Sequence, residues 1–440
     1  MKIILGVLGL VEKYTNVKYK FENEKYTEEY TTPFITDAVR QKLKNEPKTI
    51  LFVPESLLVS NYNNDIGKLK EKMKEKINSC KECTNPENID NIEFVVIPSD
   101  NWAKFQDFVI KMFCELIKII KTLRTNEEKE EIYVCCSTGQ NVYVIALLEA
   151  VRKYLTYKQL ENILQDPNII EAEIVSHPPI IQNRVVYPCE MYDFEAKAFF
   201  SLPDVKEPDK LERNRETDFW NAFSKDKQLK EFKENVGQCL NTLKIAYNSI
   251  RYNIPLSFYT PQILDISMDL EKIEESLFTI IDERQRNKIN VDAAKISNIF
   301  FSIAMLKSIK KFKDNLGNPT IHGIKNNFTE IYGKEWLSLG LNAYILKYEL
   351  DEIIEKAKKC IPTHKISLDK LLGTGGSSNQ KRNFFAHCGF IKEYTEIEIC
   401  PNNPNDYLIE WNLIEWKNKK KLDKIIKNWI REPVKKTKIG

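Results

Sequence analysis

The chain has 440 residues, of which 29% are charged, and its formal net charge is +3. This length predicts two or three domains with room for sizeable hydrophobic cores. The near balance of charge excludes a global field that would bind polyanions, so any contact with nucleic acid must come from a local patch. No apolar run reaches about 18 residues and residues 1–9 begin directly as a strand, so we expect neither a transmembrane helix nor a signal peptide.

The ten cysteines are expected to be reduced thiols, because several of them lie in apolar runs where Cys behaves as a small hydrophobic residue. Cys80 and Cys83 form half of a zinc-site pattern, but no second pair of cysteines and no nearby histidine completes it. A polar loop is therefore favoured there. We expect a cytoplasmic protein that makes no membrane contact and holds no metal ion or resident cofactor.

Strands and helices alternate in the first half of the chain. Runs rich in Val, Ile and Leu predict strands at 2–9, 49–54, 92–97, 132–137, 170–176 and 185–189. Amphipathic patterns between them predict helices at 33–43, 65–78, 102–123 and 141–155. Such alternation is typical of a mostly parallel sheet covered on both faces. We therefore expect an α/β, Rossmann-like domain at about residues 1–195.

The second half, residues 196–440, is expected to be mostly α-helical, because the hydrophobic period changes to about 3.6 residues. Helices are predicted at 228–251, 270–284, 292–312, 334–359 and 379–390, with a last basic helix at about 417–430. Alternating residues at 395–400 and 407–411 flank a turn rich in Pro and Asn, which predicts a small β-hairpin. The basic stretch 417–438 is either the solvated face of this last helix or a local nucleic-acid patch. Whether the region 195–290 is a separate linker domain stays open.

Two loops of the α/β half are candidates for a ligand site. One leaves the first strand and continues to a Tyr-Thr-Thr segment, and the other joins a strand to a helix with small hydroxyl residues and a glycine. The carboxyl ends of parallel strands meet at one edge of a sheet, so both loops should lie together and offer N–H groups to phosphates and aromatic rings to bases. Neither contains a dinucleotide or NTPase fingerprint, and ordinary capping and turn chemistry is the alternative. The candidate ligand residues are Gly9, Leu10, Tyr14, Asn16, Tyr19, Thr31, Thr32, Ser137, Thr138, Gly139, Gln140 and Asn141.

Arg382, Asn383 and His387 share one face of a predicted helix near the end of the chain. At about 100° per residue, with Arg382 at the origin, Asn383 falls at about 100° and His387 at about 140°. The opposite sector is apolar and contains Phe384, Phe385, Cys388 and Ile391. The helix therefore combines a core-facing side with a cation, an amide and an imidazole, which are groups suited to chemistry on a phosphodiester.

A single copy of this helix would be an incomplete site. Arg382 and His387 lie about 7.5 Å apart along the helix axis, and one side of them is open to solvent. Two copies meeting across a dimer axis would enclose paired Arg and His groups in a positive cleft. We therefore expect a homodimer or a larger assembly of dimers. His177 is expected only to end a strand, and His322 and His364 are assigned no role.

The segment from Arg382 to His387 matches the R-N-x-x-x-H signature of HEPN ribonucleases, with aromatic neighbours and a downstream hairpin. The α/β half resembles a CARF domain (CRISPR-associated Rossmann fold), and Gly139 and Asn141 match the end of a loop in that family. Three residues replace the Asp, Thr and His that the loop often has: Cys135, Ser137 and Thr138. The whole chain resembles the CARF–HEPN effector ribonucleases of type III CRISPR systems.

The resemblance implies that a cyclic oligoadenylate binds a CARF dimer at the two loops and repositions the HEPN domains. Cyclic tetraadenylate is the expected activator, and the hexaadenylate stays open. Arg382 and His387 would then help a ribose 2′-OH of single-stranded RNA attack its own 3′-phosphate without a metal ion, leaving a 2′,3′-cyclic phosphate and a 5′-OH. Asn383 would orient His387 or the phosphate, and His387 could serve as base or acid.

Two other functions stay open at this point. One is a ligand-sensing regulator or interaction protein without nuclease activity, for which the basic stretch near the C-terminus would be the contact element. The other is a HEPN toxin-like ribonuclease that cyclic oligoadenylate does not gate.

Overall fold

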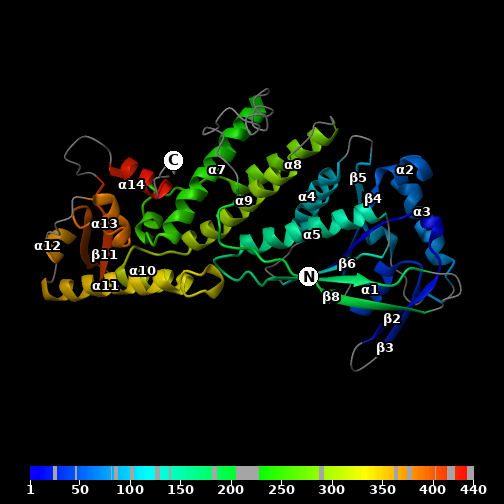
Figure 1. Cartoon of the computed structure of the whole chain (residues 1–440), viewed down its shortest axis with the longest axis horizontal. Helices are drawn as coiled ribbons and strands as arrows, with labels where there is room; N and C mark the ends of the chain where they lie inside the picture. The colour runs from blue at the N-terminus through cyan, green and yellow to red at the C-terminus, as the bar shows by residue number, and fades with distance from the viewer. Residues whose placement is uncertain are drawn as a thin grey trace, which may run out of the picture. The chain divides into compact units, whose positions relative to one another are not determined.

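The computed structural model describes residues 1–433 except 23–26, 45–46, 81, 84–87, 100–103, 124–128, 138–139, 181–185, 205–226, 287–291, 361–364, 374–378, 402 and 414–421. The chain divides into two compact units (Figure 1). Unit 1 contains Met1–Gln159, Asp166–Ala198 and Glu275–Ser297, and unit 2 contains Leu160–Gln165, Phe199–Glu274 and Asn298–Gly440. Within the described ranges, no helix is both long and apolar enough to cross a membrane.

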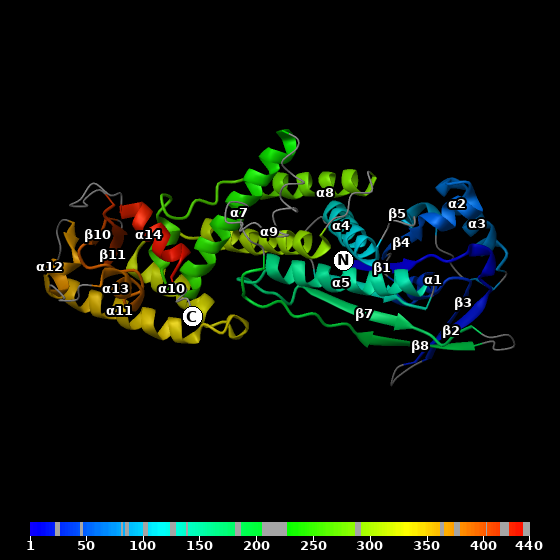
Figure 2. The ribbon, with the colours of Figure 1, turned by 45° about the horizontal axis from the view of Figure 1, so that its top comes forward.

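Unit 1 is built on an eight-stranded sheet with the order β3-β2-β8-β7-β6-β1-β4-β5. Five neighbouring strands run parallel: β7 (Ile170–Ser176), β6 (Glu130–Cys135), β1 (Lys2–Val7), β4 (Lys48–Pro54) and β5 (Glu93–Ile97). The strand β8 (Val186–Asp193) is antiparallel to β7, as Figure 2 shows. Helices α1 (Ile35–Leu43), α2 (Glu55–Tyr62), α3 (Ile66–Asn78), α4 (Phe105–Leu123) and α5 (Asn141–Glu161) complete the unit. The predicted α/β fold is confirmed.

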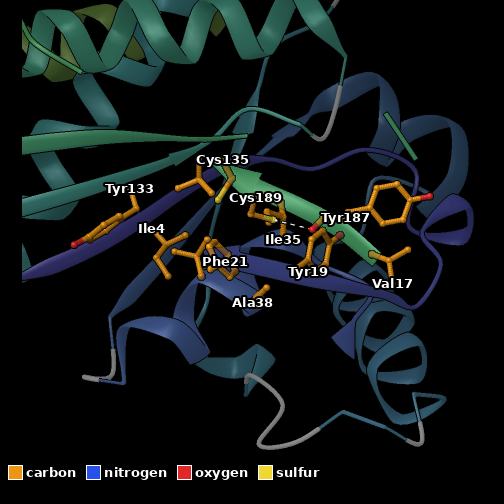
Figure 3. Close-up of a cluster of buried hydrophobic side chains, with 12 residues drawn as sticks. Ile4, Val17, Tyr19, Phe21, Ile35, Ala38, Tyr133, Cys135, Tyr187 and Cys189 are labelled. Atoms are coloured by element: carbon orange, nitrogen blue, oxygen red, sulfur yellow. Dashed lines mark hydrogen bonds between the residues drawn. The ribbon is translucent and has the colours of Figure 1, made fainter. Parts of the chain in front are cut away.

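Two strands were not predicted, because their residues were assigned to a ligand loop. They are β2 (Val17–Glu22), which pairs parallel with β8, and β3 (Thr27–Thr32), which pairs antiparallel with β2. In β2, buried Val17, Tyr19 and Phe21 alternate with half-buried lysines, which is the two-residue period of a strand with one face in a core. These side chains pack against α1 and against buried residues of β6 and β8 (Figure 3).

One expectation about cysteine is wrong. Cys80 and Cys83 form a disulfide after α3, where reduced thiols were predicted. Their Cα atoms are 5.4 Å apart, a separation within the range that a disulfide can bridge. The backbone N–H of Cys83 donates to the carbonyl of Cys80, and this turn after α3 brings the two side chains together. Two cysteines at the same spacing also form half of a zinc site, so the sequence pattern does not distinguish a disulfide from a zinc site.

Unit 2 is mostly helical, as predicted. Its helices are α7 (Lys227–Arg251), parts of α8 (Leu270–Arg286) and α9 (Ala293–Asp314), α10 (Ile321–Tyr332), α11 (Gly340–Cys360), α12 (Leu368–Leu372), α13 (Gln380–Ala386) and α14 (Leu422–Arg431). The predicted hairpin is confirmed as β10 (Thr395–Cys400) and β11 (Asn403–Trp411), to which β9 (Ile366–Ser367) adds a third strand. The helix α10 was not predicted, and it packs along α11 (Figure 1).

His322, for which the sequence predicts no role, lies in the first turn of α10, and it contacts the hairpin. The Asp406 carboxylate of β11 accepts from the backbone N–H of His322 and lies 2.8 Å from its Nδ1 atom. The same oxygen accepts the N–H of Tyr407. This pair fixes the start of α10 against the hairpin, and we assign it that structural role.

The last residues of α5 and the turn after it belong to unit 2. The Lys334 ammonium donates to the carbonyls of Leu164 and Gln165, and the Trp336 indole N–H donates to the carbonyl of Ile163 at 2.8 Å. The turn that follows α5 is therefore held by Lys334 and Trp336, which lie just before α11 in the chain.

Candidate functional site

The catalytic candidates Arg382 and Asn383 lie on α13, a helix of seven residues. Asn379 caps its start, because the side-chain oxygen accepts the backbone N–H of Arg382 at 3.0 Å. Phe384 is fully buried and its ring packs beside Trp411 and Trp429. The face of α13 that carries Phe384 is thus fixed by an aromatic core, while Arg382 of the same helix is exposed.

The helix ends earlier than predicted, which changes how His387 is presented. The prediction continued to residue 390, but α13 ends at Ala386 and His387 is its C-cap residue. Cys388 and Gly389 then have φ angles of 53° and 81°, in the left-handed region that stops a helix. The amide of Gly389 donates to the carbonyl of Phe384 at 2.7 Å, as in a Schellman turn. His387 therefore lies on a tight turn and not on a continuing helix.

Packing explains why this turn forms at Gly389. A Cβ atom there would lie 2.7 Å from the Cγ2 atom of Ile254, so a larger residue would force its neighbours apart. The Trp411 indole N–H donates to the carbonyl of Gly389 at 2.9 Å. The side-chain amide of Asn253 lies 3.1 Å from the Cys388 sulfur. Contacts from two distant segments, residues 253–254 and Trp411, thus hold the backbone that carries His387.

Glu349 of α11 is a member of the site that sequence reasoning missed. Both of its carboxylate oxygens lie 3.2 Å from Nδ1 of His387. The side chain of Glu349 is 17% exposed and that of His387 is 45% exposed, so the pair lies at the border of the core. The hydrogen bond from His387 to Glu349 raises the pKa of the imidazole above its ordinary value, although partial burial opposes the shift. No local motif could have revealed a partner 38 residues away.

The surface of α11 beside this pair carries exposed apolar residues. Leu341 and Tyr344 are each 71% exposed, and Tyr348 is 62% exposed. They recur at intervals of three and four residues, so they share one face of the helix. A contiguous patch of large exposed apolar side chains marks an interaction surface more often than a single exposed apolar residue does.

The two predicted ligand loops lie at one edge of the unit 1 sheet, as expected. Because β1, β6 and β7 run parallel in register, the chain leaves all three at the same edge. Gly9 and Leu10 follow β1, and Ser137 follows β6. The start of β2 and the end of β3 extend beyond that edge, since Val17 pairs with Thr32 and β2 aligns with the beginning of β8. Asn16, Thr31 and Thr32 therefore belong to this edge as well.

The side chains from the first loop are used in different ways. The Tyr14 hydroxyl accepts the backbone N–H of Gly9 at 2.9 Å, which closes the turn after β1. Thr32 is buried and its hydroxyl accepts the N–H of Phe34 at 3.4 Å. Tyr19 is fully buried, and burial raises the pKa of its phenol. Asn16 is exposed and Leu10 and Thr31 are half-buried.

Around the second loop, the structure adds His177, which follows β7. The Ser137 hydroxyl accepts the His177 backbone N–H at 2.7 Å and donates to its carbonyl at 3.2 Å. The His177 ring lies 5.3 Å from that of Tyr19, centroid to centroid. Within the described part of the chain, neither the Tyr19 hydroxyl nor Nε2 of His177 has a hydrogen-bond partner, although both atoms are buried. Burial lowers the pKa of His177, so its ring favours the neutral form.

At the start of α5, Gln140 and Asn141 are exposed, and the carbonyl of Gln140 accepts the N–H of Tyr143. Thr138 and Gly139 lie outside the described residues, as does His364. Of the basic stretch 417–438, residues 417–421 and 434–438 also lie outside them, while α14 and the two residues after it are described. Among the residues that are described, no group of three or more His, Cys, Asp or Glu side chains is placed to hold a metal ion.

Comparisons with known proteins match two separate parts of the chain to two domain families. Residues 3–178 match the family described as CRISPR system endoribonuclease Csx1, CARF domain, and residues 339–408 match the corresponding HEPN domain. A protein of Methanocaldococcus jannaschii named CRISPR system endoribonuclease Csx1 is 24% identical over 448 residues, covering 92% of this chain and 88% of that protein.

A solved structure, Enterococcus italicus Csm6 bound to cyclic hexa-2′-fluoro-hexa-dAMP, is similar with 12% identity and a TM-score of 0.24. It covers 79% of this chain and 99% of that chain. A TM-score this low does not establish a common arrangement. The two domain matches and the match along most of the Methanocaldococcus protein lead to one conclusion. The chain belongs to the CARF–HEPN effectors of CRISPR systems.

Proposed function

We propose that this chain is an endoribonuclease that cleaves single-stranded RNA in type III CRISPR antiviral defence when a cyclic oligoadenylate binds its CARF domain. The observation that carries the proposal is the position of His387 on a rigid turn, hydrogen-bonded to Glu349 and one helix turn after Arg382 and Asn383. The Methanocaldococcus relative is named an endoribonuclease, which supports the proposal.

The chemistry that these groups can perform is transfer of the phosphodiester to the neighbouring 2′-OH. The 2′-oxygen attacks phosphorus and loses its proton, while the bond to the 5′-oxygen breaks and that oxygen gains a proton. The products are a 2′,3′-cyclic phosphate and a 5′-OH. His387 can supply or remove a proton, and Arg382 can stabilise the negative charge that builds on the phosphorane oxygens. Asn383 would orient the phosphate, and no step requires a metal ion.

The sensor half of the proposal rests on the edge of the unit 1 sheet. Exposed Gln140 and Asn141 at the start of α5 lie after β6, beside the turn formed by Gly9 and Tyr14. Backbone N–H groups at a helix start suit a phosphate, and aromatic rings suit adenine. Cyclic tetraadenylate is our first choice of activator, with Thr138 and Gly139 as further contacts.

We also propose that the working form is a homodimer or an assembly of dimers. Arg382 is exposed and His387 is nearly half exposed, so one copy leaves the site open to water. The exposed face of α11 formed by Leu341, Tyr344 and Tyr348 supports contact with a second copy, because this helix also carries Glu349. Light scattering of the purified chain should give at least twice the mass of 51.5 kDa, and a monomer at assay concentration would contradict this.

One assay tests the function. Single-stranded RNA is incubated in EDTA with the wild type, Arg382→Ala and His387→Ala, each with no activator, with cyclic tetraadenylate or with cyclic hexaadenylate. We expect cleavage that needs a cyclic oligonucleotide, and a loss of about 10²- to 10⁴-fold in either variant. Equal cleavage without activator would refute the gating, and no cleavage under any condition would refute the nuclease.

A further inference from the structure

Glu349 is fixed more firmly than the histidine that it contacts. It lies in the middle of α11, where Leu346, Leu350 and Ile353 anchor the same helix in the core of unit 2. His387 lies on the turn after α13 and its ring is nearly half exposed. A carboxylate on a packed helix therefore holds an imidazole that would otherwise rotate in solvent.

The contact selects one nitrogen of the ring for chemistry. A carboxylate accepts hydrogen bonds and cannot donate them when ionised, so Nδ1 of His387 must carry the proton that points at Glu349. Nε2 then remains the nitrogen that can reach a substrate. In hydrolases with a histidine held in this way, the carboxylate fixes the tautomer and the orientation of the ring and stabilises the imidazolium form.

We propose that Glu349 is a positioning residue that holds His387 as an imidazolium with Nε2–H directed to the scissile phosphate, so that His387 acts as the general acid. This inference rests on the proposed ribonuclease function. As the 2′-oxygen bonds to phosphorus, its proton goes to water. As the bond from phosphorus to the 5′-oxygen breaks, that oxygen takes the Nε2 proton, and the neutral imidazole regains a proton from water.

The other charged groups around His387 do not replace Glu349. Lys392 lowers the pKa of His387 through its positive charge, and Glu352, one turn further along α11, raises it more weakly than Glu349 does. Cys388 follows His387 directly, but burial raises the pKa of its thiol, so it is neutral. Among the described residues around His387, only Glu349 combines charge with a direct hydrogen bond, which makes it the group to substitute.

The test compares Glu349→Gln, which keeps the shape and removes the charge, with Glu352→Gln as the matched control on the same helix. Nuclear magnetic resonance of the full chain, with ¹⁵N-labelled histidine, follows the ring nitrogens during a pH titration. The four histidines are assigned with the help of His387→Ala. We expect Glu349→Gln to lower the pKa of His387 and to mix its tautomers, and Glu352→Gln to change them far less.

Kinetics supply the second readout. A general acid must be protonated, so the wild-type rate should fall as pH rises through a His387 pKa that lies above its ordinary value. In Glu349→Gln this fall should begin at lower pH, and kcat should drop about 10- to 100-fold with KM little changed, which is part of what general acid catalysis contributes. Glu349→Asp, which keeps the charge, should recover part of the rate. A role in structure alone would instead lower the unfolding midpoint without moving the pH profile.

Two results would overturn the inference. One is a His387 pKa and tautomer in Glu349→Gln that match the wild type. The other is a pH profile that stays in place while kcat stays within about twofold. If the wild type cleaves no RNA at all, the proposed function fails, and the titration still decides whether Glu349 holds His387.

Discussion

The two functional regions are assembled in different ways. In unit 2, the catalytic candidates lie within six residues of sequence, on a short helix and the turn that ends it, and an aromatic core and a capping side chain fix this helix in place. In unit 1, the ligand edge is formed by the ends of separate strands, and its side chains alternate between exposed, half-buried and fully buried. One region is a short motif on rigid support, and the other is a set of loops brought together by sheet topology.

This difference suggests that unit 2 is built for catalysis and that the edge of the unit 1 sheet is built for ligand sensing. A group that transfers protons must be held in one geometry, and the turn at His387 is restrained by Trp411, Asn253 and Glu349. A sensor must gain contacts on binding, and two buried polar atoms of the ligand edge, on Tyr19 and His177, have no hydrogen-bond partner in the described structure. Substitutions should therefore separate the two functions.

The largest effect should come from Phe384→Ala. Removing a fully buried ring from between Trp411 and Trp429 leaves a cavity, and such changes lower the free energy of unfolding by about 3–5 kcal/mol. The urea midpoint of unit 2 and RNA cleavage should both fall, while calorimetry should find the wild-type affinity for cyclic tetraadenylate. An unchanged urea midpoint would show that the aromatic core does not support α13.

Asn141→Ala should have the opposite pattern. Losing one hydrogen bond from the start of α5 to the charged activator should weaken activation about tenfold and leave basal cleavage intact. The activator concentration that gives half-maximal cleavage measures this. Arg152→Ala, about three turns further along α5, is the control and should respond like the wild type. Loss of basal cleavage in Asn141→Ala would mean that the sensor lies elsewhere.

A smaller effect on activation is expected from a substitution at Trp336, which contacts the segment that follows α5 in the chain. Trp336 precedes α11 and donates to the carbonyl of Ile163, just beyond the helix that begins at Asn141. Trp336→Phe keeps most of the ring and removes this donor. The loss of one neutral hydrogen bond should alter the coupling between the sites by about 2- to 5-fold, near the lower end of what such changes do. The ratio of activated to basal cleavage should fall by that amount while basal cleavage is kept, and an unchanged ratio would exclude this segment from the coupling.

The features that could be predicted from sequence patterns are those that neighbouring residues in the chain determine. The periods of two and 3.6 residues located the parallel strands and most of the helices, and the core face of α13 followed from the spacing of its aromatic residues. The alternation in β2 is equally regular, but its residues follow the first strand directly and also fit a ligand loop, so local patterns do not decide between the two.

What could not be predicted depends on contacts between distant residues. The end of α13 is set by Ile254, which leaves no room for a side chain at Gly389, and a helical period alone continues through this position. Glu349 is one of many acidic residues on amphipathic helices, and only the packing of α11 beside the turn distinguishes it. The pairing of Ser137 with His177 likewise depends on strand order.

We propose that a ligand on the unit 1 edge controls metal-free chemistry at His387. The rate of cleavage of a single-stranded RNA in EDTA, measured with and without cyclic tetraadenylate or hexaadenylate, tests it most directly. We predict that the activator raises the rate at least about tenfold and that every product carries a 2′,3′-cyclic phosphate. His387→Ala should cleave at least about 100-fold more slowly than the wild type. Equal rates with and without activator, or products ending in a 3′-OH, would contradict the account.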